Sequence, residues 1–295
     1  MCKISIITVC YNIKDEIERT CESIISQTAN NYEWIVVDGG SIDGTVDILN
    51  KYKDKMSIFI SEKDTGIYNA MNKGIKRATG EWCIFMNGGD CFASNDIIEK
   101  FSQLDGIYKY ADIIYGNVNI INKNGRNYQK IYPYPLTKSF FYNGNTINHQ
   151  ATFIKNELFN KYGLYNENYR IVSDLEKFII FIINNSKFIR WNTTITNFHE
   201  GGISTTSINL LKKENLELNS KYFFPEEVTK TFEEGKRKIL LFNFLPIFSL
   251  KKKVFPYKIN IRLFNFIPIY SIKQKGKTYI HYLFSFIPLF TIKDK

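Results

Sequence analysis

The chain is 295 residues long, with 44% hydrophobic and 23% charged residues, a balance typical of a folded globular protein with a substantial core. Its formal net charge of +10 indicates an anionic partner, such as a nucleotide, a nucleic acid or a lipid surface. The five cysteines include no C-x-x-C pair, which argues against a disulfide framework and a zinc site and predicts a reducing, cytoplasmic compartment.

Strands and helices are expected to alternate regularly over the first 116 residues. Residues 4–9 are a continuous, β-branched run typical of a strand covered on both faces. Residues 14–28 carry apolar side chains at helical spacing. Further strands are predicted over 33–38, 57–61, 81–86 and 112–116, and further helices over about 45–53, 67–78 and 95–104. This alternation indicates a mostly parallel sheet with helices on both faces, in which ligands bind beyond the carboxyl ends of the strands.

The pattern changes twice in the second half of the chain. From residue 117 to about 205 it loosens, apart from one clear helix over 174–184. A polar helical stretch is then expected over about 207–235, followed by a basic tail that is rich in aromatic residues. One motif recurs in this tail, as LFNFLPIFSLK at 241–251, LFNFIPIYSIK at 263–273 and LFSFIPLFTIK at 283–293.

Two acidic residues lie at the carboxyl ends of predicted strands. Asp38 closes strand 33–38 within the stretch WIVVDGGSIDGT, and Asp90 comes just after a later strand. The glycines after Asp38 match neither G-x-G-x-x-G nor a P-loop, so they predict a tight turn that lets a ligand approach the backbone. The alternative interpretation of this turn is that Asp43 only caps the helix that follows.

Six motifs give this pattern a family resemblance. They are, in chain order, SIITVCYN (5–12), VVDGGSIDGT (36–45), DTGIYNAMNKGI (64–75), ATGEW (78–82), NGGD (87–90) and NHQATFI (148–154). Together they resemble the family 2 glycosyltransferases with the GT-A fold, and most closely the bacterial enzymes that build surface polysaccharides. The resemblance implies an α/β domain over 1–205, with a mostly parallel sheet flanked by helices.

Within this domain, the resemblance implies that residues 1–116 bind a nucleotide-diphosphate sugar and that 117–205 bind the acceptor. The residues that match the family's nucleoside-binding positions are Val9, Asp38 and Asp64. Asn72 and Lys73, on the helix after Asp64, are further donor-binding candidates. For Lys73 the alternative is a solvated surface lysine.

The stretch MNGGD (86–90) corresponds to the family's D-x-D metal motif and departs from it. Only the last acid survives, as Asp90, while Asn87 and Gly89 stand at the other places. The resemblance implies that Asn87 and Asp90 contact the donor and that Asp90 binds Mg or Mn, because one carboxylate together with diphosphate oxygens can hold a hard cation. The alternative is that Asp90 caps a loop and binds no metal.

Glycosyl transfer requires a base that takes the proton of the acceptor hydroxyl. In the family this base is an aspartate that opens a helix in the acceptor half, and the stretch RIVSDLEKF (170–178) matches that context. It nominates Asp174 as the catalytic base, with Glu176 as the reserve candidate, and direct displacement predicts inversion. The alternative is that Ser173 and Glu176 form an S-x-x-E capping box and that Asp174 only complements the helix dipole.

Three further residues are assigned to substrate binding. His149 and Gln150, within NHQATF, are placed on the acceptor side, although an isolated histidine is often structural. His199, within FHEGGIS (198–204), is assigned to a loop over the donor, where it could reach a phosphate. The stretch KFIRW (187–191) has lysine where processive synthases have the glutamine of Q-x-x-R-W, so addition of a single sugar is expected.

The tail, residues 206–295, is expected to bind an anionic membrane surface. Each repeat surrounds a proline with phenylalanine and isoleucine and ends in lysine, which predicts short amphipathic segments. This would place the enzyme on the inner face of the plasma membrane without crossing it, because no apolar run reaches the roughly 20 residues of a spanning helix. The alternative is a small β-hairpin or helical appendage that packs on the core or on a second subunit, and the oligomeric state stays open.

The sequence therefore predicts an inverting glycosyltransferase that moves one sugar from a nucleotide-diphosphate sugar to a hydroxyl of a lipid-linked or oligosaccharide acceptor, in surface polysaccharide synthesis. The alternative function is a nucleic-acid binder that uses the aromatic, lysine-rich tail. Nucleic acid is not the expected partner, because acids at three strand ends would repel a phosphate backbone. A sugar-phosphate nucleotidyltransferase would need a Gly-rich, Arg-containing loop after the first strand, and TVCYNIKD (8–15) supplies none.

Overall fold

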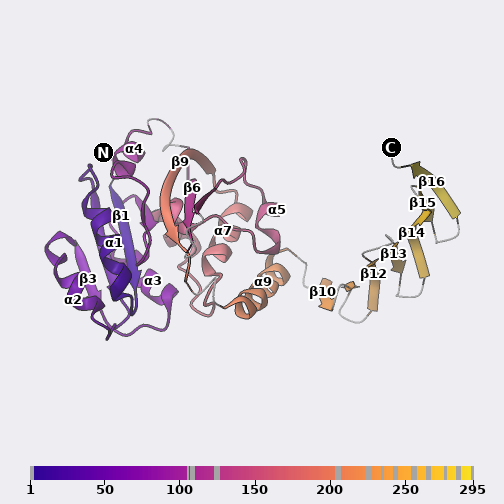
Figure 1. Cartoon of the computed structure of the whole chain (residues 1–295), viewed down its shortest axis with the longest axis horizontal. Coiled ribbons are helices and arrows are strands. Elements are labelled where there is room, and N and C mark those ends of the chain that lie inside the picture. The colour runs from indigo at the N-terminus through magenta and orange to yellow at the C-terminus, as the bar shows by residue number, and fades with distance from the viewer. Residues whose placement is uncertain are drawn as a thin grey trace. The chain divides into compact units, whose positions relative to one another are not determined.

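The structure is a computed structural model of the whole chain (Figure 1). It describes residues 3–104, 106, 110–122, 127–202 and 207–223, and beyond these the backbone of strands between 228 and 293. The chain divides into two compact units, residues 1–215 and residues 216–295. Unit 1 therefore extends past residue 205, where the sequence places the end of the first domain.

The described residues of unit 1 form a nine-stranded sheet. Four neighbouring strands are all parallel, in the order β3 (Ile58–Ser61), β2 (Tyr32–Asp38), β1 (Ile4–Cys10) and β4 (Trp82–Phe85). The sheet continues with β8 (Thr152–Lys155), β6 (Ile113–Ile121), β9 (Phe188–His199) and β5 (Cys91–Phe92), and β7 (Asn127–Lys130) pairs with β6. β8 runs antiparallel to both β4 and β6, whereas β6 and β9 are parallel.

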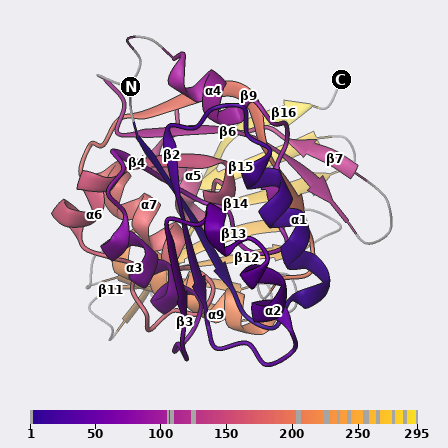
Figure 2. The same ribbon diagram turned by 90° about the vertical axis from the view of Figure 1, so that its left-hand side faces the viewer.

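Helices cover both faces of this sheet (Figure 2). Their bounds are α1 (Lys14–Ile25), α2 (Thr45–Asn50), α3 (Ile67–Arg77), α4 (Ile97–Ser102), α5 (Lys138–Phe141), α6 (Asn156–Tyr162), α7 (Ser173–Ile183) and α9 (Ile208–Tyr222). α1 and α2 lie on one side of the parallel strands and α3 on the other, as right-handed crossovers require when the strand order reverses at β1. The predicted α/β architecture is confirmed.

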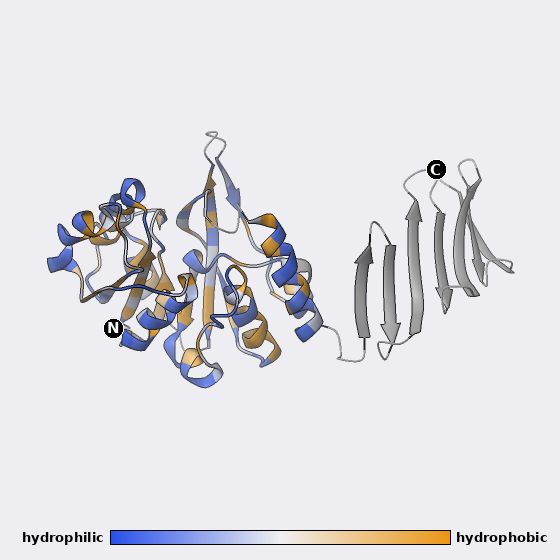
Figure 3. Ribbon diagram, turned by 90° about the horizontal axis from the view of Figure 1, so that it is seen from below, coloured by the Kyte–Doolittle hydropathy of each residue, from blue (hydrophilic) through white to orange (hydrophobic). Residues whose placement is uncertain are grey.

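The core lies between the strands and the inward faces of the helices (Figure 3). All seven residues of β1 are buried, which explains why this strand is apolar and β-branched without alternation. Gly74 lets α3 approach β1 closely, because a Cβ at this position would lie 2.5 Å from the Cγ2 of Ile7. The packing of α3 on β1 holds the start of α3 near the carboxyl edge of the sheet.

A buried carboxylate joins the amino-terminal ends of the central strands. Glu33, on β2, is 6% exposed and accepts hydrogen bonds from the Lys3 ammonium (2.9 Å), the Ser5 hydroxyl (2.6 Å), Thr79 and the Gly80 backbone N–H (3.0 Å). Burial alone raises the pKa of Glu33, but these hydrogen bonds outweigh it and lower the pKa to about 2. Glu33 therefore stabilises the fold at the edge opposite the candidate site.

The described backbone of unit 2 forms a seven-stranded antiparallel sheet. Its strands follow in chain order as β10 (Val228–Glu233), β11 (Lys236–Leu241), β12 (Leu245–Lys253), β13 (Lys258–Leu263), β14 (Ile267–Lys275), β15 (Thr278–Leu283) and β16 (Ile287–Lys293). A helix is expected over about 207–235, but α9 ends at Tyr222. The prediction is wrong for the second half of this stretch, where the structure has β10. None of the helices in the described part of the chain is long and apolar enough to cross a membrane.

The repeats of the tail form strand pairs. Pro246, Pro268 and Pro288 each occupy the second position of a strand, beside a shift in strand register. Proline has no N–H to donate to the ladder, so it is tolerated at a strand start and at a bulge. The segments before each proline (242–244, 264–266 and 284–286) lie outside the described residues. The proline of each repeat thus marks a strand start, in agreement with strand pairing as in the alternative of a β-hairpin rather than with the short helical segments that an interrupted helix suggested.

Candidate active site

Asp38 organises the turn at the carboxyl end of β2. Its side chain is fully buried, and its Oδ2 accepts hydrogen bonds from the backbone N–H groups of Gly40 and Ser41 (both 3.0 Å) and from the Ser61 hydroxyl (2.7 Å). The Ser41 hydroxyl donates to Oδ1. Asp43 accepts from the backbone N–H of Thr45, the first residue of α2, and from that of Lys14, the first residue of α1 (3.0 Å each). Asp38 therefore shapes the turn, and its predicted contact with a nucleoside stays a prediction.

Asp64 lies directly against this turn. A Cβ on Gly39 would lie 2.5 Å from the Asp64 Oδ2 and 3.3 Å from the Cδ2 of the Tyr11 ring, so a larger residue here would displace the Asp64 carboxylate. Burial raises the pKa of Asp64, while the Gly66 backbone N–H and the nearby Lys73 oppose the rise. Tyr11 is 58% exposed. The sequence reasoning missed it, although an aromatic residue directly after the first strand was a signal for a stacking surface.

Three other predicted donor-side residues connect elements of the fold. The backbone carbonyl of Val9 accepts from the Gly88 N–H (2.9 Å), which joins β1 to the NGGD turn. The amide of Asn72 is buried and pairs with the backbone of Tyr165 in both directions (2.9 Å each) and with Glu167. Lys73 forms an ion pair with Glu62 (2.8 Å) on the chain just after β3. The contacts of Asn72 and Lys73 hold α3 in place, and direct contact of the three residues with a donor stays a prediction.

Asp90 is buried where three segments of the chain meet. It is 6% exposed, its Oδ2 accepts from the Gln150 side-chain amide (2.9 Å), and its Oδ1 accepts from the backbone N–H of His199 (3.2 Å). Burial raises the pKa of Asp90 to about 6, although these two hydrogen bonds lower it, as do the nearby His149 and Arg19. Gln150, which was assigned to the acceptor side, and His199, which was assigned to the donor loop, thus both contact the predicted metal ligand.

The NGGD turn and Gln150 each carry a buried amide oxygen without a hydrogen-bond partner among the described residues. They are Asn87 Oδ1 and Gln150 Oε1. Burial of an unpaired acceptor is costly, so these two oxygens are available to accept a hydrogen bond or to bind a cation. Within the described residues, no group of three or more His, Cys, Asp and Glu side chains is arranged to hold a metal. A cation here would therefore need the amide oxygens or oxygens of a substrate.

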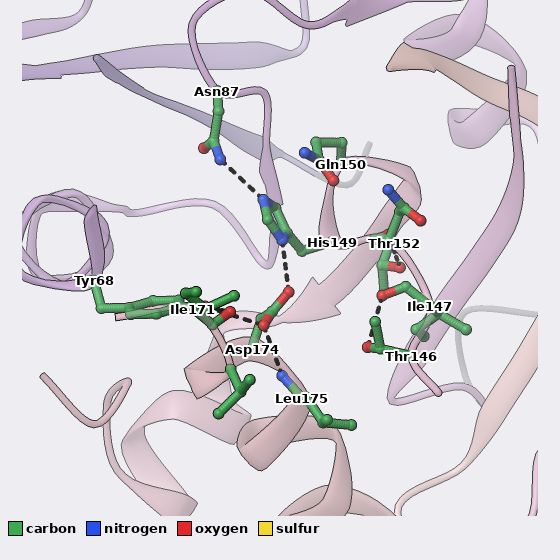
Figure 4. Close-up of polar contacts among 12 residues, drawn as sticks. Tyr68, Asn87, Thr146, Ile147, His149, Gln150, Thr152, Ile171, Asp174 and Leu175 are labelled. Atoms are coloured by element: carbon green, nitrogen blue, oxygen red, sulfur yellow. Dashed lines mark hydrogen bonds and ion pairs between the residues drawn. The ribbon is translucent and has the colours of Figure 1, made fainter. Parts of the chain in front are cut away.

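Asp174 lies in the first turn of α7 and faces His149 (Figure 4). The Asp174 Oδ2 is 2.9 Å from the Nδ1 of His149, and the other ring nitrogen, Nε2, is 2.9 Å from the Nδ2 of Asn87. The Asp174 Oδ1 contacts the hydroxyl of Tyr68 (3.1 Å) and the backbone N–H of Leu175 (2.8 Å). The predicted base and a residue predicted to lie on the acceptor side are therefore direct partners.

The capping box that the sequence allowed at the start of α7 is not formed. Val172 is the residue before the helix, and no side chain caps it. The Ser173 hydroxyl is buried without a partner among the described residues. Glu176, the reserve base, is 3% exposed, whereas 13% of the Asp174 side chain is exposed. Asp174 is the more accessible of the two acids.

A contact that the sequence reasoning missed anchors the segment before α7. Glu214, on α9, is 4% exposed and accepts from the backbone N–H groups of Arg170 (2.8 Å), Ile171 (2.9 Å) and Val172 (3.2 Å). A charged acceptor with several backbone donors is a strong interaction. Glu214 thereby fixes the path of the chain into the helix that carries Asp174, and no local motif in a polar helix signals such a contact.

Two clusters therefore lie along the carboxyl edge of the parallel strands. One contains Asp38 and Asp64 at β2 and β3, and the other contains Asp90 and Asp174, which are joined through Gln150 and His149. β1 separates β2 from β4, so the strand ends that start the two clusters are about 10 Å apart at the usual strand spacing. An extended ligand of the size of a nucleotide-diphosphate sugar can span that distance.

The family model "Glycosyl transferase family 2" matches residues 5–166, a segment that contains every strand and turn of both clusters except the region of α7 and His199. This chain belongs to glycosyl transferase family 2. The predicted resemblance is confirmed, and the chain is a glycosyltransferase with homologues in glycan and glycolipid biosynthesis.

Two curated relatives cover most of the chain. A PGL/p-HBAD biosynthesis glycosyltransferase of Mycobacterium tuberculosis is 30% identical over 209 residues, which are 69% of this chain and 80% of the relative. A cholesterol galactosyltransferase of Borreliella burgdorferi is 26% identical over 238 residues, which are 74% of this chain and 66% of the relative. Both similarities extend beyond the family model into the region of Asp174.

Solved structures of glycosyltransferases share the fold. S. aureus TarS in complex with UDP-GlcNAc aligns with a TM-score of 0.58 at 17% identity, covering 76% of this chain and 68% of TarS. A mannosyltransferase of Pyrobaculum calidifontis in complex with GDP-Man and Mn2+ aligns with a TM-score of 0.56 at 14% identity, covering 75% of this chain and 64% of that protein. At this level of identity, the two structures establish the GT-A fold and nothing further about this chain.

Proposed function

We propose that this glycosyltransferase is an inverting enzyme that moves one sugar from a nucleotide-diphosphate sugar to an acceptor hydroxyl. The observation that carries the proposal is the dipeptide His149–Gln150, whose two side chains contact Asp174 and Asp90 respectively. A proton acceptor thereby lies next to a buried oxygen ligand. Attack by a hydroxyl on an anomeric carbon that carries a diphosphate requires those two groups side by side.

The nucleoside of the donor is proposed to bind at the cluster of Asp38 and Asp64. The exposed ring of Tyr11 next to Asp64 offers a stacking surface for the base, and the Asp64 carboxylate can accept hydrogen bonds from base or ribose. Solved neighbours with this fold bind UDP-GlcNAc and GDP-Man, which supports a nucleotide sugar as the donor. A binding panel of nucleotide sugars identifies the sugar and the nucleotide of the donor.

A divalent cation, Mg or Mn, is proposed to bind at Asp90. The residues fit such an ion, because Asp90 and the unpartnered amide oxygens of Asn87 and Gln150 are hard oxygen donors. The Pyrobaculum neighbour contains Mn2+, which supports this assignment. When bound, such an ion would neutralise the negative charge of the diphosphate leaving group.

Asp174 is proposed to act as the base of the transfer. The acceptor O–H bond breaks, its proton passes to Asp174, and the oxygen forms the new bond to the anomeric carbon. The bond between that carbon and the diphosphate oxygen breaks, and its electron pair leaves with the nucleoside diphosphate. Because this is a single displacement on the face opposite the leaving group, the product is inverted at the anomeric carbon.

The acceptor is proposed to be a lipid-linked glycan at an anionic membrane surface. One curated relative is named for transfer to cholesterol, which supports a lipid acceptor. In unit 2 the strand register pairs Lys236 with Lys251 and Lys258 with Lys273. These lysine positions therefore lie toward the same end of the strands. Each lysine near an anionic surface contributes about 1 kcal/mol, which supports peripheral association on the inner face of the plasma membrane.

A thermal-shift panel of nucleotide sugars, measured with and without Mn2+, identifies the donor, since binding to the folded state stabilises it by RT ln(1 + [L]/Kd). With that donor, Asp174→Asn is expected to lower turnover by about 10²- to 10⁴-fold while the thermal shift stays unchanged. Asp54→Asn, which changes an exposed carboxylate, is the matched control. Full turnover by Asp174→Asn would remove Asp174 as the base.

A further inference from the structure

The two carboxylate oxygens of Asp174 have different environments. Oδ1 accepts from the Leu175 N–H (2.8 Å) and contacts the hydroxyl of Tyr68 (3.1 Å), which shares its single proton with the carbonyl of Ile171. Oδ2 contacts the His149 ring (2.9 Å). An ionised carboxylate offers about four lone-pair sites. Oδ2 is therefore the oxygen that keeps an accepting site for a substrate proton, and His149 is the side chain that sets its direction.

The contacts of His149 determine which ring nitrogen carries its proton. A carboxylate only accepts, so the nitrogen that faces Asp174, Nδ1, must donate. In a neutral ring Nε2 then accepts, and the nitrogen facing it belongs to the side-chain amide of Asn87, which donates at 2.9 Å. The chain Asn87–His149–Asp174 in Figure 4 thus has one consistent hydrogen-bond direction.

The packing around the ring preserves this orientation. The His149 side chain is 12% exposed, and its ring meets the ring of Phe85 edge to face, with centroids 6.4 Å apart. His149 also opens the short helix η3 (His149–Ala151), where the backbone N–H of Ala151 bonds to the Asn148 carbonyl. A ring held on two sides cannot turn without breaking these contacts, so it is suited to hold another side chain in place.

We propose that His149 is the positioning residue for the catalytic base. It donates its Nδ1 proton to Asp174 Oδ2 throughout the reaction, keeps the remaining lone pair of that oxygen directed at the acceptor hydroxyl, and ties the base to Asn87 in the NGGD turn. This inference rests on the proposed role of Asp174 as base. In the transfer the acceptor proton moves to Asp174, and the proton of His149 stays where it is.

Two substitutions at one position separate the two nitrogens. In His149→Asn, the side-chain Nδ2 takes the place of the ring Nδ1 and can still donate to Asp174. In His149→Gln, the side-chain Oε1 takes the place of the ring Nε2 and can accept from Asn87, so no donor is left at the position that faces Asp174. If His149 positions Asp174, the Asn variant keeps turnover within about tenfold of the unchanged enzyme, and the Gln variant loses on the order of 10²-fold, the effect of a small misplacement.

The outcomes that overturn the inference are distinct. If His149 is itself the base, with Asp174 as its orienting partner, both variants lose turnover alike. If His149 only fills space, both keep it alike. Donor binding, followed as the thermal shift with the donor and Mn2+, must persist in both variants for the comparison to report on transfer. Asp174→Asn, measured in parallel, tests the proposed function separately. Full turnover by this variant would refute the role of Asp174 as base, but it would not contradict the contact between His149 and Asp174.

The tautomer of His149 can also be measured directly on the unchanged enzyme. The chain has three histidines, so the ring nitrogens of a ¹⁵N-labelled sample give few signals, and the His149→Asn spectrum assigns those of His149. The spectrum of the neutral ring is expected to show His149 protonated at Nδ1. The neutral ring protonated at Nε2 would overturn the inference, because it cannot donate to Asp174.

Discussion

Replacing the buried carboxylate of Glu33 by an amide is expected to destabilise the fold at neutral pH. Glu33 ionises with a pKa of about 2, against an ordinary value of 4.5, because hydrogen bonds from Ser5, Lys3 and Thr79 outweigh the effect of burial. A difference of this size corresponds to about 3 kcal/mol of stability. Lys3 is half-exposed, so solvent screens its share, and we expect Glu33→Gln to cost about 2 kcal/mol.

The sign of the pH dependence follows from the lowered pKa. Above pH 4.5 the carboxylate is ionised in both the folded and the unfolded state, so its full contribution is present. Below that pH the unfolded chain takes up the proton first, and the contribution falls by up to roughly 1.4 kcal/mol per pH unit until the folded form is protonated near pH 2. The gap between the unchanged protein and Glu33→Gln should therefore be constant at neutral pH and narrow as the solution is acidified below 4.5.

Urea denaturation followed by circular dichroism at a series of pH values measures this gap, with the midpoint shift read at constant slope. Glu157→Gln is the matched control, because Glu157 is an exposed carboxylate on α6, and it should change stability by less than about 0.5 kcal/mol. The reasoning is refuted if Glu33→Gln is as stable as the unchanged protein at neutral pH, or if the gap does not narrow in acid.

Three further changes test the site and the tail. Glu214→Gln should cost about 2 kcal/mol in urea denaturation and lower turnover while the donor-induced thermal shift persists, whereas a normal rate would show that the anchor of α7 is dispensable. Tyr11→Ala should weaken nucleotide binding by about 1–3 kcal/mol, measured by titration calorimetry with UDP, and unchanged affinity would remove the stacking role. Truncation after residue 223 should release the protein from vesicles that contain anionic lipid in a sedimentation assay, and equal sedimentation would contradict membrane binding through the tail.

The fold of unit 1 was predictable because its signals are local. Continuous apolar runs predicted β1 and β2, and helical spacing predicted α1 and α7, each within a few residues of the bounds in the structure. The alternation of these elements is itself a rule for parallel sheets. The tail lacked such rules, since its prolines are compatible with short helical segments and with strand starts alike, and the helix beyond Tyr222 was predicted where the structure has β10.

By itself, the sequence of this protein determined the strands, the helices and the acids at the strand ends, because period, β-branching and motif order are written along the chain. Tertiary structure alone decided which of those residues meet. His149 reaches Asp174 and Gln150 reaches Asp90 because β8, which follows them, inserts antiparallel between β4 and β6. Strand order depends on the packing of the whole sheet, so no local pattern could reveal these contacts.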